Sequence, residues 1–118
     1  MDTLADLEDL KQRLRSFVAE RDWAKFHSPK NLAMALSVEV AELVEQFQWL
    51  TEAQSAGLDD ARRRRVEDEL ADVLVYLVRL ADQLDVDLLA VTARKLQDNA
   101  RKYPADQVRG QARKYDEY

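Results

Sequence analysis

Two pairs of acidic residues have a type and spacing that suit metal chemistry. Glu39 and Glu42 are three residues apart in "VEVAELVEQFQWL", and Glu69 and Asp72 have the same spacing in "VEDELADVLVYLVRL". Residues at i and i+3 of an α-helix are spatial neighbours, so each pair would present two carboxylates together. None of the four has a basic residue at i+4 to neutralise it. Each pair therefore destabilises its helix unless a cation binds between the carboxylates.

The helices that must position these acids are indicated by the apolar spacing. Apolar residues recur at helical intervals along the chain, and no stretch alternates as a strand would. Ser28 before Pro29 is typical of a helix start, Asp59 suits an N-cap, and Pro104 ends the last helix. Helices are expected at about 3–21, 29 to 50 or 52, 60–84 and 88–103. Four helices with short connections predict an all-α four-helix bundle.

A helical wheel places the acids beside the apolar faces rather than opposite them. The predicted core face of the second helix consists of Leu32, Leu36, Val40, Leu43, Phe47 and Leu50. That of the third helix consists of Val66, Leu70, Val73, Leu77, Leu80 and Leu84. If the two helices pack, the four carboxylates share one site, where repulsion and desolvation oppose their ionisation. Mg²⁺ would offset both costs, since it binds carboxylates together with substrate phosphates. Spacing alone leaves ordinary surface acids as the alternative.

Aromatic, amide and basic side chains accompany the acids. The set consists of Trp23, Trp49, Tyr76, Lys95, Asn99 and Lys102. Aromatic rings stack on bases, an amide hydrogen-bonds a base edge, and lysines neutralise phosphates. With a metal site, this set predicts a nucleotide-binding site. For Phe26 we favour a place in the core, and for the lone His27 a surface or structural position is the alternative to a role in the site.

Composition excludes several other classes of protein. The 118 residues suit one domain, and two glycines leave no room for a glycine-rich phosphate loop. With no cysteine and one histidine, thiolate, disulfide and histidine-rich zinc chemistry are excluded, and a reducing cytoplasm is expected. The acidic N-terminus does not resemble a signal peptide, and no apolar run is long enough to span a membrane. The net charge of −5 argues against a nucleic acid polymer as partner, and "RRRR" at 62–65 is interpreted as a solvated face or subunit contact.

Three segments carry a resemblance to a known family: "DWAKFHSPKNLAMALSVEVAELVEQFQW", "DELADVLVYLVRLADQLDVDL" and "KLQDNARKYP". They resemble the MazG-like all-α nucleotide pyrophosphohydrolases, nearest to the dCTP pyrophosphatase branch. The resemblance covers about residues 22–104 of a single domain at 1–118. It implies Mg²⁺-dependent hydrolysis of dCTP or modified dCTP to the monophosphate and pyrophosphate, which cleanses the nucleotide pool. It also implies a homotetramer with sites at a dimer interface.

The resemblance assigns expected roles to individual residues. Glu39, Glu42, Glu69 and Asp72 would hold the metal, with Glu39 or Glu42 as the catalytic base. The expected substrate-binding residues are Trp23, His27, Asn31, Trp49, Tyr76, Lys95 and Asn99. Two alternatives stay open: the same fold acting on dUTP or on many NTPs, and a helical module that binds nucleotides without hydrolysing them.

Overall fold

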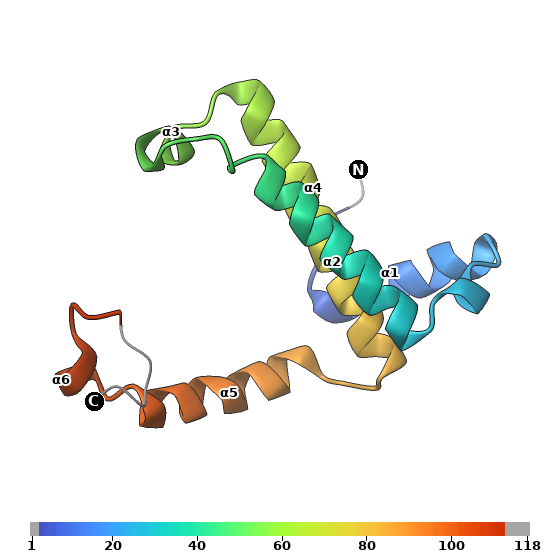
Figure 1. The fold of residues 1–118 in the computed structure, drawn as a ribbon. Coiled ribbons are helices and arrows are strands. Elements are labelled where there is room, and N and C mark those ends of the chain that lie inside the picture. The colour runs from blue at the N-terminus through green and yellow to red at the C-terminus, as the bar shows by residue number, and fades with distance from the viewer. Residues whose placement is uncertain (1–2, 113–118) are drawn as a thin grey trace. The chain divides into compact units, whose positions relative to one another are not determined.

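The computed structural model describes residues 3–112, which form two compact units at 3–85 and 86–112 (Figure 1). Every regular element in this range is a helix, which confirms the predicted all-α class. None of these helices is both long and apolar enough to cross a membrane. The first unit contains α1 (Leu7–Glu20), the 3₁₀ helix η1 (Ala24–Phe26), α2 (Pro29–Glu45), α3 (Glu52–Ala56) and α4 (Asp60–Gln83). The second contains α5 (Leu88–Lys102) and α6 (Ala105–Val108), and the single-domain reading stays a prediction.

Side-chain caps define where the helices begin. The Ser28 hydroxyl accepts a hydrogen bond from the Asn31 amide at 3.2 Å, and Asp59 accepts one from the Arg62 amide at 2.8 Å. Both were predicted as N-caps. The first helix begins at Leu7 rather than at residue 3, because Asp6 caps it by accepting from the Asp9 amide at 2.8 Å.

The predicted second helix is too long, because α2 ends at Glu45. Thr51 and Gln54 form a capping box, in which each side chain accepts from the other residue's backbone amide, at 3.1 and 2.9 Å. This reciprocal pair starts a new helix, so the chain turns between α2 and α3 instead of continuing. The short helices η1, α3 and α6 were not predicted.

The antiparallel pair α2 and α4 forms the centre of the first unit, and α1 packs on α4 (Figure 1). Arg62 near the start of α4 contacts the end of α2, whereas Arg79 near the end of α4 contacts His27, just before α2. Leu32 of α2 is the most buried large side chain, at 1% exposure. The other buried apolar residues are Leu10, Val18, Val66, Val78 and Ala81. The side-by-side arrangement sets the acidic stripes of α2 and α4 against each other.

Much of the apolar surface predicted to be core is exposed in the single chain. Val40, Leu70, Leu77 and Leu84 were placed on core faces, yet all four are exposed. Two packed helices bury only the seam between them, so side chains beyond the seam need another covering surface. Further exposed apolar residues of α2 and α4 are Met34, Val38, Val44 and Leu74.

The arginine run at 62–65 is partly structural. Arg63 and Arg64 form exposed ion pairs with acids one turn on, at 3.3 and 3.5 Å, as expected of a solvated face. In contrast, Arg62 Nη1 donates to the Gln46 backbone carbonyl at 2.6 Å, and Arg65 Nε donates to the Gln46 side chain at 3.2 Å. These bonds fasten the start of α4 to the C-terminal end of α2, where helix carbonyls lack partners.

Replacing Arg62 with alanine should therefore destabilise the first unit. We expect the free energy of unfolding to fall by about 1–3 kcal/mol, since a half-buried charged hydrogen bond to a helix terminus is lost. Urea denaturation followed by circular dichroism measures the change. Arg63→Ala is the matched control, and it should change stability by less than about 0.5 kcal/mol. Equal effects in the two variants would contradict the capping role of Arg62.

Candidate metal and nucleotide site

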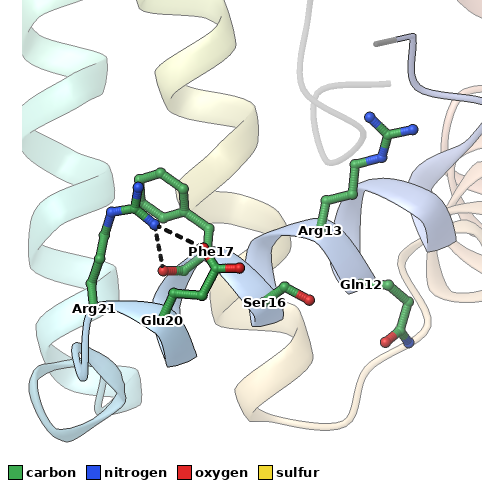
Figure 2. A pocket seen from close by; sticks show the side chains of 6 residues that line it. All are labelled: Gln12, Arg13, Ser16, Phe17, Glu20 and Arg21. Carbon is green, nitrogen blue, oxygen red and sulfur yellow. Dashed lines mark hydrogen bonds and ion pairs between the residues drawn. The ribbon is translucent and has the colours of Figure 1, made fainter.

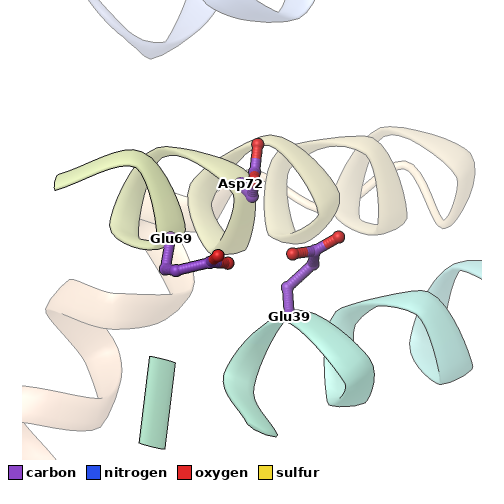
Figure 3. A group of neighbouring side chains, drawn as sticks. All are labelled: Glu39, Glu69 and Asp72. Carbon is purple, nitrogen blue, oxygen red and sulfur yellow. The ribbon is translucent and has the colours of Figure 1, made fainter. Parts of the chain in front are cut away.

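Three carboxylates from two helices converge in the first unit (Figure 3). Glu39 comes from α2, whereas Glu69 and Asp72 come from α4, and one carboxylate oxygen of each lies within 4.8 Å of the others. Glu39 and Glu69 are half-buried and Asp72 is exposed. Glu42, one turn after Glu39, is half-buried and lies outside this tightest group. Its carboxylate nevertheless contributes to the raised pKa of Glu39 and of Glu69. The structure thus gathers three of the four predicted acids at the α2–α4 seam.

The electrostatics of the cluster favour a bound cation. Burial, followed by hydrogen bonding and charge from Glu42, raises the pKa of Glu39 to about 7. Burial and then Glu42 also raise the pKa of Glu69. Oε2 of Glu39 and Oε2 of Glu69 are buried without a hydrogen-bond partner. No ion pair within residues 3–112 includes any of the four acids.

The donor set fits a hard divalent cation. All its ligand atoms are carboxylate oxygens, which Mg²⁺ prefers, and neither a thiolate nor an imidazole belongs to the group. Buried carboxylate oxygens without partners carry a free-energy cost that a cation would remove. The residues present therefore suit Mg²⁺ on chemical grounds.

The loop before α2 is held by two side-chain hydrogen bonds. Asn31 Nδ2 donates to the Phe26 backbone carbonyl at 3.1 Å, so its amide braces the loop from the first turn of α2. Arg79 Nε of α4 donates to Nδ1 of His27 at 3.3 Å. Burial and then the charge of Arg79 lower the pKa of His27. Both predicted substrate-binding residues thus lie in an ordered segment beside the end of α4.

The three predicted aromatic residues have different surroundings. Trp23 packs edge-on against Phe17 of α1, with ring centroids 5.8 Å apart, and is 44% exposed. Trp49 lies in the turn after α2 and is 86% exposed. Tyr76 is half-buried on α4, one turn beyond Asp72. Trp49 thus leaves almost its whole ring free to stack on a base.

The prediction that Phe26 fills the core is wrong. Its side chain is 58% exposed, and Lys25 Nζ lies 5.5 Å from its ring centroid. The 3₁₀ turn of η1 directs the ring outward, whereas the sequence suggested only an apolar residue in a loop.

Lys95 and Asn99 lie four residues apart on α5, in the second unit. Lys95 is exposed and Asn99 is half-buried. The spacing places them on one face of the helix, as predicted. Their contact with a substrate stays a prediction.

Arg79 is the residue near the site that sequence reasoning missed. It lies seven residues after Asp72, so it continues the stripe of Glu69, Asp72 and Tyr76 along α4. It is buried, at 4% exposure, and pairs with Asp82 at 3.4 Å as well as with His27. The available signal was a basic residue at i+7 from a candidate ligand, inside an apolar run.

A separate surface hollow lies along α1, away from these residues in the sequence (Figure 2). Arg21 crosses it, donating to the Phe17 carbonyl at 3.0 Å and pairing with Glu20 at 3.5 Å. Its lining consists of Gln12, Arg13, Ser16, Phe17, Glu20 and Arg21. None of these belongs to the predicted site.

Comparisons with known proteins identify a family and several relatives of this chain. The model of the MazG-like family matches residues 34–118. Human dCTP pyrophosphatase 1 is 45% identical over 113 residues, covering 94% of this chain and 66% of the human protein. The mouse protein of the same name is 44% identical, covering 92% of this chain and 65% of its own length, so this chain spans about two thirds of these relatives. A pyrophosphatase structure from Archaeoglobus fulgidus superposes with a TM-score of 0.80 and 41% identity, covering 88% of this chain and 97% of that one.

Proposed function

Because the chain belongs to the MazG-like family, we propose that it is a Mg²⁺-dependent nucleoside triphosphate pyrophosphohydrolase. Its substrate is dCTP or a modified dCTP, and its products are the monophosphate and pyrophosphate. The acidic cluster of Glu39, Glu69 and Asp72, with two buried carboxylate oxygens lacking partners, carries the proposal. The substrate is inferred from the similarity to dCTP pyrophosphatase 1 of several mammals.

The four acids Glu39, Glu42, Glu69 and Asp72 are the proposed metal ligands. When bound, Mg²⁺ supplies positive charge that neutralises triphosphate oxygens and lowers the pKa of bound water. The two glutamates of α2 then have a second task, since hydrolysis releases a proton from the attacking water. We assign acceptance of that proton to the Glu39–Glu42 pair.

In the hydrolysis, the oxygen of water bonds to phosphorus while the bond to the oxygen bridging the α- and β-phosphates breaks. This step releases pyrophosphate and the monophosphate.

The remaining predicted residues bind the nucleotide. Tyr76, with Trp23, His27 and Asn31, serves the base and sugar. Trp49, which follows the opposite end of α2 from His27, serves them from a neighbouring chain. Lys95 and Asn99 of a neighbouring chain serve the phosphates.

A homotetramer is the proposed assembly. Several large apolar side chains of the packed helices α2 and α4 are exposed, among them Met34, Val38, Leu70 and Leu74. Burying such side chains on a second copy is favourable by roughly 25 cal/mol per Å². A cytoplasmic location, without a membrane or nucleic acid polymer as partner, stays a prediction from the sequence.

Pyrophosphate release with purified protein tests the reaction. We expect Mg²⁺-dependent release, fastest with dCTP or a 5-modified dCTP and abolished by EDTA, with the monophosphate as the other product. A panel of canonical dNTPs and NTPs measures selectivity. Equal rates on dUTP or many NTPs would replace the dCTP assignment with a broader one. Nucleotide binding in calorimetry without any turnover would leave the non-catalytic helical module.

A further inference from the structure

A chain of polar contacts, buried at Arg79 and Asp82, connects α1, α4 and the loop before α2. Arg15 of α1 donates through Nε and Nη2 to the two carboxylate oxygens of Asp82, at 2.7 and 2.5 Å. The other guanidinium that reaches Asp82 is Arg79, which in turn donates to His27. Arg79 and Asp82 have side-chain exposures of 5% and 9%. Because Asp82 is held from both sides, the Arg79 guanidinium has a fixed place beside the imidazole.

The hydrogen bond to Arg79 determines which nitrogen of His27 carries the proton. A guanidinium can only donate hydrogen bonds, so Nδ1 of His27 must be an unprotonated acceptor. The neutral ring then carries its hydrogen on Nε2. A second proton would make the ring positively charged next to the Arg79 guanidinium. Burial first, and then the charge of Arg79, lower the pKa of His27. His27 is therefore a neutral ring with a defined donor.

The Nε2–H group has no acceptor within residues 3–112 and lies across the ring from Arg79. We propose that Arg79 is a positioning residue, which fixes His27 so that Nε2–H donates to an acceptor oxygen on the base or sugar of the nucleotide. This inference rests on the proposed function, because it assigns a donor to the same site.

The location of the pair suits a nucleotide whose phosphates meet the acidic cluster. Arg79 follows Asp72 by seven residues on one face of α4, a rise of about 10 Å. A nucleoside triphosphate is long enough to extend along this face, with its phosphates at Asp72 and its nucleoside toward His27. Tyr76 lies between the two positions on the same stripe.

The test uses the full-length protein labelled with ¹⁵N. His27 is the only histidine of the chain, so long-range ¹H–¹⁵N spectra show a single imidazole. Without ligand, we expect Nε2 to be protonated and Nδ1 unprotonated at neutral pH. Titration with dCMP and Mg²⁺ should shift the Nε2 resonance without any turnover. In Arg79→Met the ring should sample both tautomers, and the Kd for dCMP should rise about tenfold, the effect of losing one good hydrogen bond.

Two further variants separate orientation from general damage to α4. Arg79→Lys keeps a donor and should recover part of the dCMP affinity and of the Nε2–H population. Arg63→Met removes an exposed arginine of the same helix, which pairs with Glu67, and should match the wild type in both measurements.

The wild-type spectra decide the outcome even if Arg79→Met fails to fold. An Nδ1–H tautomer, or imidazole nitrogens that do not respond to dCMP, would overturn the inference. If the wild type shows the expected tautomer and dCMP shift but never releases pyrophosphate, the hydrolase proposal fails while the role of Arg79 stands. If the enzyme releases pyrophosphate normally but the His27 resonances do not respond to dCMP, the hydrolase proposal stands and the role of Arg79 fails.

Discussion

Asp72→Asn is expected to lower pyrophosphate release from dCTP by about 100-fold or more, while the protein stays folded. The substitution removes one negative charge from the cluster of Glu39, Glu69 and Asp72 and weakens the Mg²⁺ site. Asp72 is exposed and near isosteric with asparagine, so the packing of α4 should not change. Steady-state kinetics at saturating Mg²⁺, with circular dichroism of the same sample, measure activity and folding together.

Asp68→Asn is the matched control for this loss. Asp68 lies one turn before Asp72 on the same helix, is exposed, and pairs with Arg64 at 3.5 Å. The control should keep wild-type activity, because its carboxylate does not belong to the cluster. Activity retained in Asp72→Asn, or lost equally in both variants, would rule out the proposed metal site. Glu42→Gln extends the test to the acid outside the tightest group, and as a ligand it should behave like Asp72→Asn.

The gathering of the acids was predictable because two periodicities agree. The i and i+3 spacing sets each pair on one helix face, and the neighbouring apolar stripe turns that face toward the partner helix. Once α2 and α4 pack antiparallel, Glu39 meets Glu69 and Asp72. Local chemistry also fixed the helix starts at Ser28 and Asp59.

The errors arose where one local signal competes with another or where tertiary contacts decide. Apolar spacing continues through Phe47 and Leu50, yet α2 ends at Glu45 and the capping box at Thr51 starts a new helix. A wheel shows the direction of Leu70 and Leu77 but not whether anything covers them. The burial of Arg79 depends on Asp82 and, beyond it, on Arg15, which lies 67 residues from Asp82 in the sequence.

The metal-free protein is expected to lose stability as the pH rises from about 4.5 to about 7. Burial and neighbouring carboxylates raise the pKa of Glu39 from 4.5 to about 7 in the folded chain, and the pKa of Glu69 is raised as well. In this window the folded state binds more protons than the unfolded state, so the free energy of unfolding falls with increasing pH. Glu39→Gln removes the ionisable group, and the variant should therefore melt at a higher temperature than the wild type at pH 7.5 in EDTA.

Mg²⁺ should make the wild type melt at a higher temperature than Glu39→Gln, which reverses their order in EDTA. A cation at 100 times its dissociation constant adds about 2.7 kcal/mol to the stability of the state that binds it. The wild type should gain this stabilisation at pH 7.5, whereas Glu39→Gln, with a weakened site, should gain much less. Glu45→Gln, an exposed position of the same helix, should follow the wild type with and without Mg²⁺. Thermal melts across pH 4.5–7.5 provide the measurement. A Glu39→Gln variant that is less stable than the wild type in EDTA would show that Glu39 stabilises the fold instead of serving as a metal ligand.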